Sequence, residues 1–372
     1  MSTKILAHIV PRLRVALEET GYMADIPLLI PISIFLCLGF LLNGFLALMC
    51  TLTGCVLGAL ALFDLLVHHF GLQWREKRPP RLDNRDAFDL TLQRRACRSF
   101  QSSDLSDSDR RELLAFQEAQ ESLPGYQLGS SPVRFEYVNA PTLKVVPAIH
   151  CREFLVALAP KEYSRMSVID VGRCLQKTVI HATRMGLATC WIGPGADQAS
   201  VIRHLGERYD KTADHVICVC AFGYKSNLIP LVLRVMCFFH HMRKPLTSLF
   251  FSDHAFQKPL GMTARHIAPY ARCLEAARWG PSSFNEQPTR GLAIVRKDDK
   301  GETQLSRLDF YSATKSRYYA AVAAGIWLAN WELCCNELGL KGHFQVLPES
   351  EREGISVEPM VYNVTWIVDS ES

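Results

Sequence analysis

The chain opens with a long stretch of hydrophobic positions that no charge interrupts. Between Asp25 and Asp64 no residue is charged, and residues 26–63 are mostly Leu, Ile, Phe, Ala and Gly. As one helix this stretch would be roughly 57 Å long at ~1.5 Å per residue, nearly twice the ~30 Å hydrocarbon core of a bilayer. Asn43-Gly44, near its middle, is a turn signal. The pattern therefore predicts a transmembrane helical hairpin over residues 26–67.

Basic residues flank this hairpin on both sides. They are Lys4, Arg12 and Arg14 before it, and Arg75, Lys77, Arg78 and Arg81 after it. Because basic flanks favour the cytoplasmic side, we expect residues 1–25 to be a cytoplasmic or interfacial segment and the soluble part to lie on the cytoplasmic face of a membrane. The membrane could also be that of an organelle, because the first seventeen residues contain three basic residues and no acidic one. A single tilted helix and a buried core hairpin remain alternatives.

The rest of the chain, after a basic, proline-rich linker at 75–85, mixes helical and strand patterns. Helices are predicted where hydrophobic residues recur with the helical period and a capping sequence precedes them or a glycine follows them. Strands are predicted at short runs of apolar residues. The helices are Arg110–Ala119 and Val171–Met185, and the strands are Phe135–Val138, Phe154–Leu158 and Val216–Phe222. Another apolar stretch, Leu228–Phe239, is too short to span a bilayer, and could lie on a membrane surface or pack as an ordinary helix.

The second half of the chain repeats part of this order. Gly172–Leu175, running to Gly186-Leu187, aligns without a gap onto Gly325–Leu328, running to Gly339-Leu340. In each copy a helix is followed by a glycine stop and an aromatic-bearing strand. We interpret this as one internal duplication, with halves at 86–245 and 246–372. Chance recurrence of helix, glycine and strand is the alternative.

Composition excludes several classes of function. The net charge of +4 is small, and no Lys/Arg run is interleaved with aromatic residues, so no nucleic-acid partner is expected. Thirteen cysteines form neither a disulfide framework nor the paired spacing of a zinc site, which predicts buried thiols, a reducing compartment and no metal. No Ser-His-Asp or paired-carboxylate constellation stands out, so no catalytic side chain is assigned.

Two motifs favour a phosphorylated, ring-bearing cofactor. In the segment 94–100, the guanidinium groups of Arg94 and Arg98 would share one face if the segment is helical, and such planar charged groups suit a phosphate. The segment 280–288 is a polar turn whose N–H groups, hydroxyls and amides suit the edge of a heteroaromatic ring.

Five motifs at compatible spacings resemble the FMN-dependent nitroreductase family. They are Arg-Arg-x-x-Arg-x-Phe at 94–100, Gly-Leu-Ala-Thr-Cys-Trp-Ile-Gly at 186–193, Phe-Gly-Tyr at 222–224, Arg-Lys-Pro-Leu at 243–246 and Pro-Ser-Ser-x-Asn-x-Gln-Pro at 281–288. The resemblance covers nearly everything after residue 85 and implies an α+β, nitroreductase-like fold. The usual family member is a homodimer with two FMN sites, each drawing on both subunits.

The order of the motifs resembles a single-chain branch of the family in which both protomers are fused. The first half carries the arginine set without the Pro-Ser-Ser turn, and the second half carries the turn without the arginine set. Together with the duplication, this predicts a monomeric pseudo-dimer whose halves kept complementary parts of one composite FMN site.

The resemblance also assigns roles to cofactor-binding residues. Arg94, Arg98 and Arg243 would hold the FMN phosphate, and Arg95 would lie along the ribityl chain. Ile192 and Gly193 would bring the Gly193 N–H towards flavin N5, where such a donor favours the reduced flavin. The ring edge would be held from the other half by Pro281, Ser282, Ser283 and Asn285.

Three positions depart from the family pattern. Ala96 stands where a hydroxyl residue is usual, Pro194 removes a backbone donor after Gly193, and Thr289 replaces the usual Trp after Gln-Pro. These departures bear on flavin affinity and potential rather than on the fold.

The resulting hypothesis is a membrane-anchored FMN oxidoreductase that passes electrons from NADH or NADPH to a small-molecule acceptor such as a quinone or nitroaromatic. The chemistry would then belong to the cofactor. An alternative from another class is a flavin-free nitroreductase fold that serves as a membrane-associated scaffold or complex subunit. A third is an iodotyrosine-deiodinase-like dehalogenase, although the displaced Pro-Ser-Ser turn argues against it.

Overall fold

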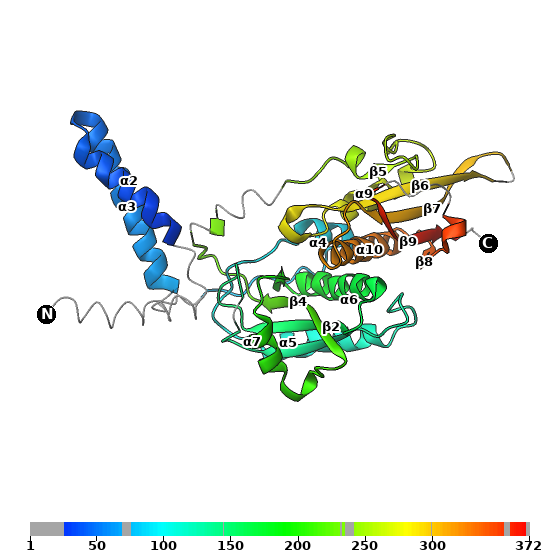
Figure 1. The fold of residues 1–372 in the computed structure, drawn as a ribbon, viewed down its shortest axis with the longest axis horizontal. Coiled ribbons are helices and arrows are strands. Elements are labelled where there is room, and N and C mark those ends of the chain that lie inside the picture. The colour runs from blue at the N-terminus through cyan, green and yellow to red at the C-terminus, as the bar shows by residue number, and fades with distance from the viewer. Residues whose placement is uncertain are drawn as a thin grey trace.

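The computed structural model describes residues 26–68, 76–143, 145–230, 233–234, 242–298, 300–352 and 358–369, and shows a helical hairpin projecting from a two-sheet body (Figure 1). The helices are α2 (Ile26–Leu41), α3 (Gly44–His68), α4 (Ala87–Gln93), α5 (Asp107–Glu121), α6 (Arg165–Arg184), α7 (Gln198–Leu205), α9 (Ala271–Arg278) and α10 (Tyr319–Glu337). The strands are β1 (Arg134–Asn139), β2 (Glu153–Pro160), β3 (Ala188–Ile192), β4 (Asp214–Gly223), β5 (Phe250–Phe251), β6 (Thr289–Lys297), β7 (Thr303–Ser312), β8 (Gly342–Gln345) and β9 (Val361–Val368).

The two sheets have the same strand order. The first is β1-β2-β4-β3, and the second is β6-β7-β9-β8 with β5 added in parallel beside β6. The other pairings between these strands are antiparallel, as Leu155 opposite Cys220 and Phe310 opposite Val364 illustrate. The long helix lies between β2 and β3 along the chain in the first half and between β7 and β8 in the second, and the three predicted strands are confirmed as β1, β2 and β4.

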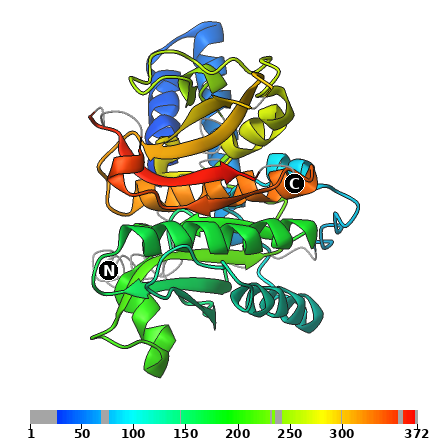
Figure 2. The same cartoon turned by 90° about the vertical axis from the view of Figure 1, so that its right-hand side faces the viewer.

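The long helices α6 and α10 pack against each other in the middle of the body, between the two sheets (Figure 2). At their contact, a Cβ placed on Gly172 would lie 2.2 Å from the Val322 carbonyl oxygen, and one on Gly325 would lie 1.9 Å from the Ile169 carbonyl oxygen. Both positions therefore require glycine. They are the two glycines that the sequence alignment placed opposite each other.

Both central helices also end in the same way. The φ angle is +79° at Gly186 and +68° at Gly339, which glycine adopts without a steric penalty. In each case the glycine N–H and the N–H of the following leucine bond back to the last turn of the helix, which is a Schellman motif. The predicted glycine stops are thus confirmed.

Two helix starts are set by serine caps. Ser106 accepts from the Asp109 N–H at 3.2 Å, and α5 begins at the next residue, close to the prediction. Ser164 accepts from the Ser167 N–H at 3.3 Å, so α6 begins six residues before the predicted Val171. The hydrophobic period alone missed this polar first turn.

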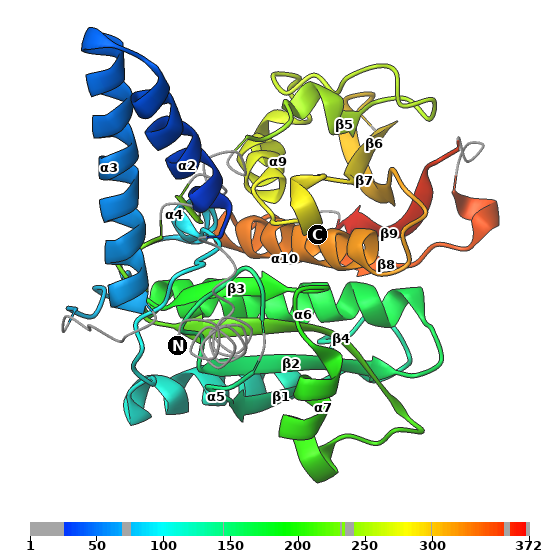
Figure 3. The ribbon, with the colours of Figure 1, turned by 60° about the vertical axis from the view of Figure 1, so that its left-hand side comes forward.

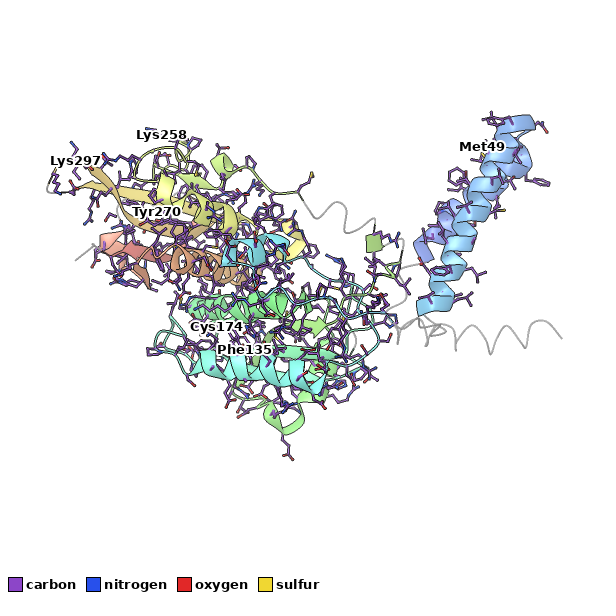
Figure 4. All side chains as sticks on the ribbon, turned by 180° about the vertical axis from the view of Figure 1, so that it is seen from behind. Met49, Phe135, Cys174, Lys258, Tyr270 and Lys297 are labelled. Atoms are coloured by element: carbon purple, nitrogen blue, oxygen red, sulfur yellow. The ribbon has the colours of Figure 1, made fainter. Side chains whose placement is uncertain are left out.

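The N-terminal stretch forms two adjacent helices, α2 and α3, that separate at residues 42–43, where the turn was predicted. At ~1.5 Å per residue they are about 24 and 37 Å long. By length and composition, Gly44–Val67 is the one helix within the described ranges that could cross a membrane, and Leu28–Leu41 is a shorter apolar helix. Most of their large apolar side chains are exposed, and Met49 lies near the far end of the hairpin (Figure 4). Residues 1–25 and most of 228–239 fall outside the described residues.

The linker that follows the hairpin is bound to the first half. Its Glu76 carboxylate accepts from the Ser226 hydroxyl at 2.7 Å, and the Leu82 N–H donates to the Arg184 carbonyl at 2.7 Å. Arg81 forms an ion pair of 2.7 Å with Glu112 on α5. From Glu76 onward, the linker thus has defined attachments to the first half.

Helix α4 belongs to the first half by sequence and packs against α9 and α10 of the second half as well as against α6 (Figure 3). Ala87 and Phe88 lie in a hydrophobic core made mostly of second-half residues, and the Arg272 guanidinium lies 4.0 Å from the Phe88 ring centroid. The Ala87 N–H donates to the Glu337 carboxylate at 3.1 Å. This crossover brings the arginine motif after α4 to the second half.

Candidate functional site

The arginine motif leaves α4 as extended chain. Helix α4 ends at Gln93, and the Cys97 N–H donates to the Thr189 carbonyl of β3 at 2.8 Å. The idea that Arg94 and Arg98 share a helix face is therefore wrong, because the segment runs along the edge of β3 instead of continuing the helix. Arg98 is half-buried, and its carbonyl accepts from the Ile149 N–H at 2.9 Å.

Arg94 is a buried cation. Only 5% of it is exposed, and its Nη1 has no hydrogen-bond partner within the ranges that the structure describes. Burial lowers the pKa of Arg94 to about 10, with further lowering by the neighbouring charges of Arg243 and Arg95. The guanidinium is still protonated at neutral pH. A buried guanidinium beside two others matches the donor set that a phosphate requires.

Three guanidinium groups surround the ring of Trp279, at the end of α9. The carbon of the guanidinium lies 4.8 Å from the ring centroid for Arg95, 5.2 Å for Arg243 and 5.8 Å for Arg278. Burial lowers the pKa of Arg243 to about 10, and Arg95 and Arg278 add to the shift. The indole N–H of Trp279 donates to Glu275 at 2.9 Å. The ring thus holds arginines from three distant segments together.

The polar turn binds the segment that carries Arg243. Asn285 Oδ1 accepts from Arg243 at 2.6 Å, and Asn285 Nδ2 donates to the Met242 carbonyl at 2.8 Å. Gln287 accepts from the Lys244 N–H at 2.8 Å, while its own N–H donates to Ser282 Oγ at 2.9 Å. Arg94, Arg95, Arg243 and Asn285 are therefore brought into one group, which we call the arginine cluster. Pro281, Ser282 and Ser283 are half-buried beside it.

Part of the turn has an uncommon backbone conformation. Phe284, Asn285 and Gln287 have φ angles of +51°, +57° and +51°. Non-glycine residues in this region cost about 1–3 kcal/mol each and are concentrated at functional sites. The hydrogen bonds to Met242 and Lys244 hold the turn in this form.

Gly193 follows directly after Ile192, the last residue of β3. The Thr189 carbonyl, near the start of β3, points away from β4 and accepts from the Cys97 N–H. A Cβ on Gly193 would lie 3.7 Å from the Tyr319 ring, which belongs to the second half. Ile192 is buried, and neither residue forms a hydrogen bond with the arginine cluster among the described residues.

The three residues that depart from the family pattern lie in different environments. Ala96 is exposed and pairs with Thr189, and Pro194 is exposed directly after Gly193. Thr289 is fully buried at the start of β6, and its hydroxyl has no partner within the described ranges. In the same ranges, no group of three His, Cys, Asp or Glu side chains could hold a metal ion.

Sequence reasoning missed several residues of the site. Trp279 was not considered, although it stands directly before the polar turn. Lys244 and Gln287 lie inside two of the motifs but received no role. Tyr319 has no signal in the sequence, because its place depends on how α10 packs.

The arrangement defines an α+β protein with a cationic, phosphate-compatible cluster built from both halves. The chain belongs to the family described as "Putative TM nitroreductase", whose sequence model matches residues 88–318. It is thus a member of the nitroreductase family of oxidoreductases. A search of the curated proteins finds no match to this chain.

Several solved structures are similar to the chain. A "putative nitroreductase" from Thermotoga maritima is 16% identical, with a TM-score of 0.44, covering 80% of this chain and 97% of that one. A nitroreductase with bound FMN from Bacteroides fragilis is 16% identical, with a TM-score of 0.32, covering 39% and 91%. Another with bound FMN, from Desulfitobacterium hafniense, is 16% identical, with a TM-score of 0.31, covering 39% and 92%.

Proposed function

We propose that this protein is a membrane-anchored, FMN-dependent oxidoreductase that passes electrons from NADH or NADPH to a quinone or nitroaromatic acceptor. The observation that carries the proposal is Arg94, a buried guanidinium with no hydrogen-bond partner for Nη1 in the described ranges and with two further arginines close by. The group stays charged at neutral pH, because losing its proton would require a pH near 10, and a bound anion would compensate this buried charge. A phosphate monoester does this with three acceptor oxygens.

We further propose that the chain is a fused pseudo-dimer with one composite site. The equal strand orders, the paired glycines at the α6–α10 contact and the two Schellman motifs support this. The crossover of α4 supports a shared site, because it is the element that carries Arg94 and Arg95 to Trp279 of the second half. One chain would then supply the whole FMN site, without a second copy of the protein.

The residues present fit an FMN. Arg94, Arg243 and Arg95 would bind its phosphate, with Arg98 further along the same segment. Gly193 would offer its N–H from the end of β3. Ser282 and Ser283 would meet the ring edge, with Pro281 shaping the turn. Asn285, which bonds to Arg243, would assist the phosphate end as well as the ring edge.

A bound FMN would supply reversible hydride and electron transfer at its ring. The chain's own task is to bind and orient it. The arginine cluster fixes the charged end, and an N–H donor at Gly193 favours negative charge on the ring. Tyr319, whose ring lies 3.7 Å from the position that a Cβ on Gly193 would occupy, would form a wall of the space where donor and acceptor bind in turn.

Membrane anchoring through residues 26–67 completes the proposal. The length of α3 and the exposed apolar side chains of the hairpin support it, and a lipophilic acceptor could then reach the site from the bilayer. The soluble part would lie on the cytoplasmic side.

An absorbance spectrum of the detergent-purified full chain tests the proposal, with any released flavin identified by mass. About one FMN per chain, and faster oxidation of reduced nicotinamide with a quinone than with buffer alone, are the expected results. A colourless protein that takes up no added FMN would instead support the scaffold, which the Ala96 and Pro194 departures favour. Turnover of a halotyrosine would support the dehalogenase.

A further inference from the structure

The arginine cluster carries more positive charge than one FMN phosphate can compensate. Three further cations adjoin Arg94, Arg95 and Arg243, namely Lys244, Arg278 and Arg290. Two carboxylates lie among the six cations: Glu275, which binds Arg278, and Glu286, whose charge acts on Lys244. Among the described residues this leaves an excess of four positive charges. A phosphate monoester carries only about two negative charges at neutral pH.

We call the three additional cations the outer layer, because all three are less buried than Arg94; Arg278 also lies beside the Trp279 ring with Arg95 and Arg243. Lys244 Nζ donates to the Glu286 carbonyl at 2.7 Å, and Arg290 Nη1 donates to the carbonyls of Gln287 and Thr289 at 2.7 and 2.8 Å. Arg278 Nη1 donates to the Lys244 carbonyl at 3.3 Å. All three side chains are thus tied to residue 244 or to the backbone of 286–289. Arg94, by contrast, is buried beside β3 and β4.

The electrostatics of this outer layer are consistent with a second anion. Burial lowers the pKa of Lys244, and the charge of Arg290 lowers it further. Burial also lowers the pKa of Arg290. Lys244 and Arg290 donate to neutral carbonyls and Arg278 is paired with Glu275, so binding of an anion would reduce the repulsion that remains between the three cations.

We propose that Lys244, Arg278 and Arg290 bind a second phosphate monoester beside the FMN phosphate, and that this group is the 2′-phosphate of NADPH. NADPH and NADH differ by this group alone. A terminal phosphate has three free oxygens for three cationic groups, whereas the pyrophosphate that both dinucleotides share presents fewer free oxygens per phosphorus. The inference rests on the proposed function and deepens it, because it selects NADPH as the electron donor.

Binding of NADP+ and NAD+ to the full chain in detergent, measured by calorimetry without turnover, tests this inference. We expect NADP+ to bind at least about tenfold more tightly than NAD+, since hydrogen bonds to charged groups are worth about 1.5–3 kcal/mol each. The preference should shrink as salt is added, because the outer cations are partly exposed. Flavin absorbance is recorded on the same samples, so a failure to bind FMN is seen separately.

Two double variants sharpen the experiment. Lys244→Met with Arg290→Met should reduce the preference for NADP+ to less than about threefold while the flavin absorbance is retained. Lys258→Met with Lys297→Met removes two charges from the outer part of the second half, far from the turn, and should leave the preference unchanged (Figure 4). Equal affinity of the unaltered protein for NADP+ and NAD+ would overturn the proposal. So would displacement of NADP+ by an equal concentration of inorganic phosphate, because the site would then not be selective for the dinucleotide.

Discussion

At the scale of single residues, burial of the Arg94 charge lowers the stability of the folded protein. Among the described residues no carboxylate pairs with its guanidinium, and its pKa falls from 12.5 to about 10, so the folded protein disfavours the charged form. At every pH below about 10, the buried charge of Arg94 therefore lowers the free energy of unfolding of the anion-free protein. This destabilisation decreases only as the pH rises from the pKa of Arg94 in the folded protein to its pKa in the unfolded chain.

Replacing Arg94 by methionine should therefore stabilise the flavin-free protein and abolish FMN uptake. We expect a gain of about 1–3 kcal/mol in the free energy of unfolding, because an uncompensated buried charge is replaced by an apolar side chain of similar length. Chemical denaturation and FMN titration of the same preparation measure both effects. Unchanged FMN affinity would remove Arg94 from the site.

The pH dependence of FMN binding follows from the same groups. The phosphate gains its second charge near pH ~6, and Arg94 and Arg243 lose theirs near a pKa of about 10. FMN affinity should rise from pH 5 to 7, stay level to about pH 9, and fall above about pH 10. Quenching of flavin fluorescence on binding measures this profile, and a constant affinity between pH 5 and 7 would contradict recognition of the phosphate.

At the scale of elements, the α6–α10 contact depends on two glycines whose missing side chains let the backbones touch. A Cβ at Gly325 would lie 1.9 Å from a backbone carbonyl oxygen, which cannot move aside as a flexible side chain could. The helices would have to separate, and every residue packed between them would lose contact.

Gly325→Ala should lower the free energy of unfolding by at least about 3 kcal/mol and weaken FMN binding, because the site spans both halves. Gly261→Ala is the matched control. A Cβ there would meet only the Ala264 Cβ at 4.0 Å, and Gly261 does not have a positive φ. Thermal unfolding of both variants measures the difference, and equal melting temperatures would show that the helices can separate at little cost.

Many helix ends and strands could be predicted from the sequence, because short local motifs determine them. Serine and glycine caps marked helix ends at Ser106, Gly186 and Gly339, and β-branched runs marked the strands. The extended path of Arg94–Phe100 could not be predicted, because it depends on pairing with β3. The crossover of α4 could not either, since an apolar helix face does not indicate which half covers it.

At the scale of the whole molecule, the composite site and the hairpin make separate predictions about assembly. A fused pseudo-dimer should be monomeric in detergent by light scattering and should bind about one FMN per chain. Two FMN per chain, or a stable dimer required for binding, would contradict the composite site.

The hairpin should retain the protein in membranes after washing with high salt or alkaline carbonate, because apolar contacts with lipid do not depend on charge. Release by salt alone would indicate an electrostatic surface contact instead. Centrifugation of washed membranes, followed by detection of the full chain, separates these outcomes.

The crossover of α4 also sets the order in which the protein is made and folded. The Ala87 N–H of α4 bonds to Glu337 at the end of α10, which is synthesised 250 residues later. At ~5–20 residues per second, α4 would wait roughly 13–50 seconds on the ribosome for its partner in α10. During that interval the nascent chain would depend on chaperones, and the two halves would become folded together once translation is nearly complete.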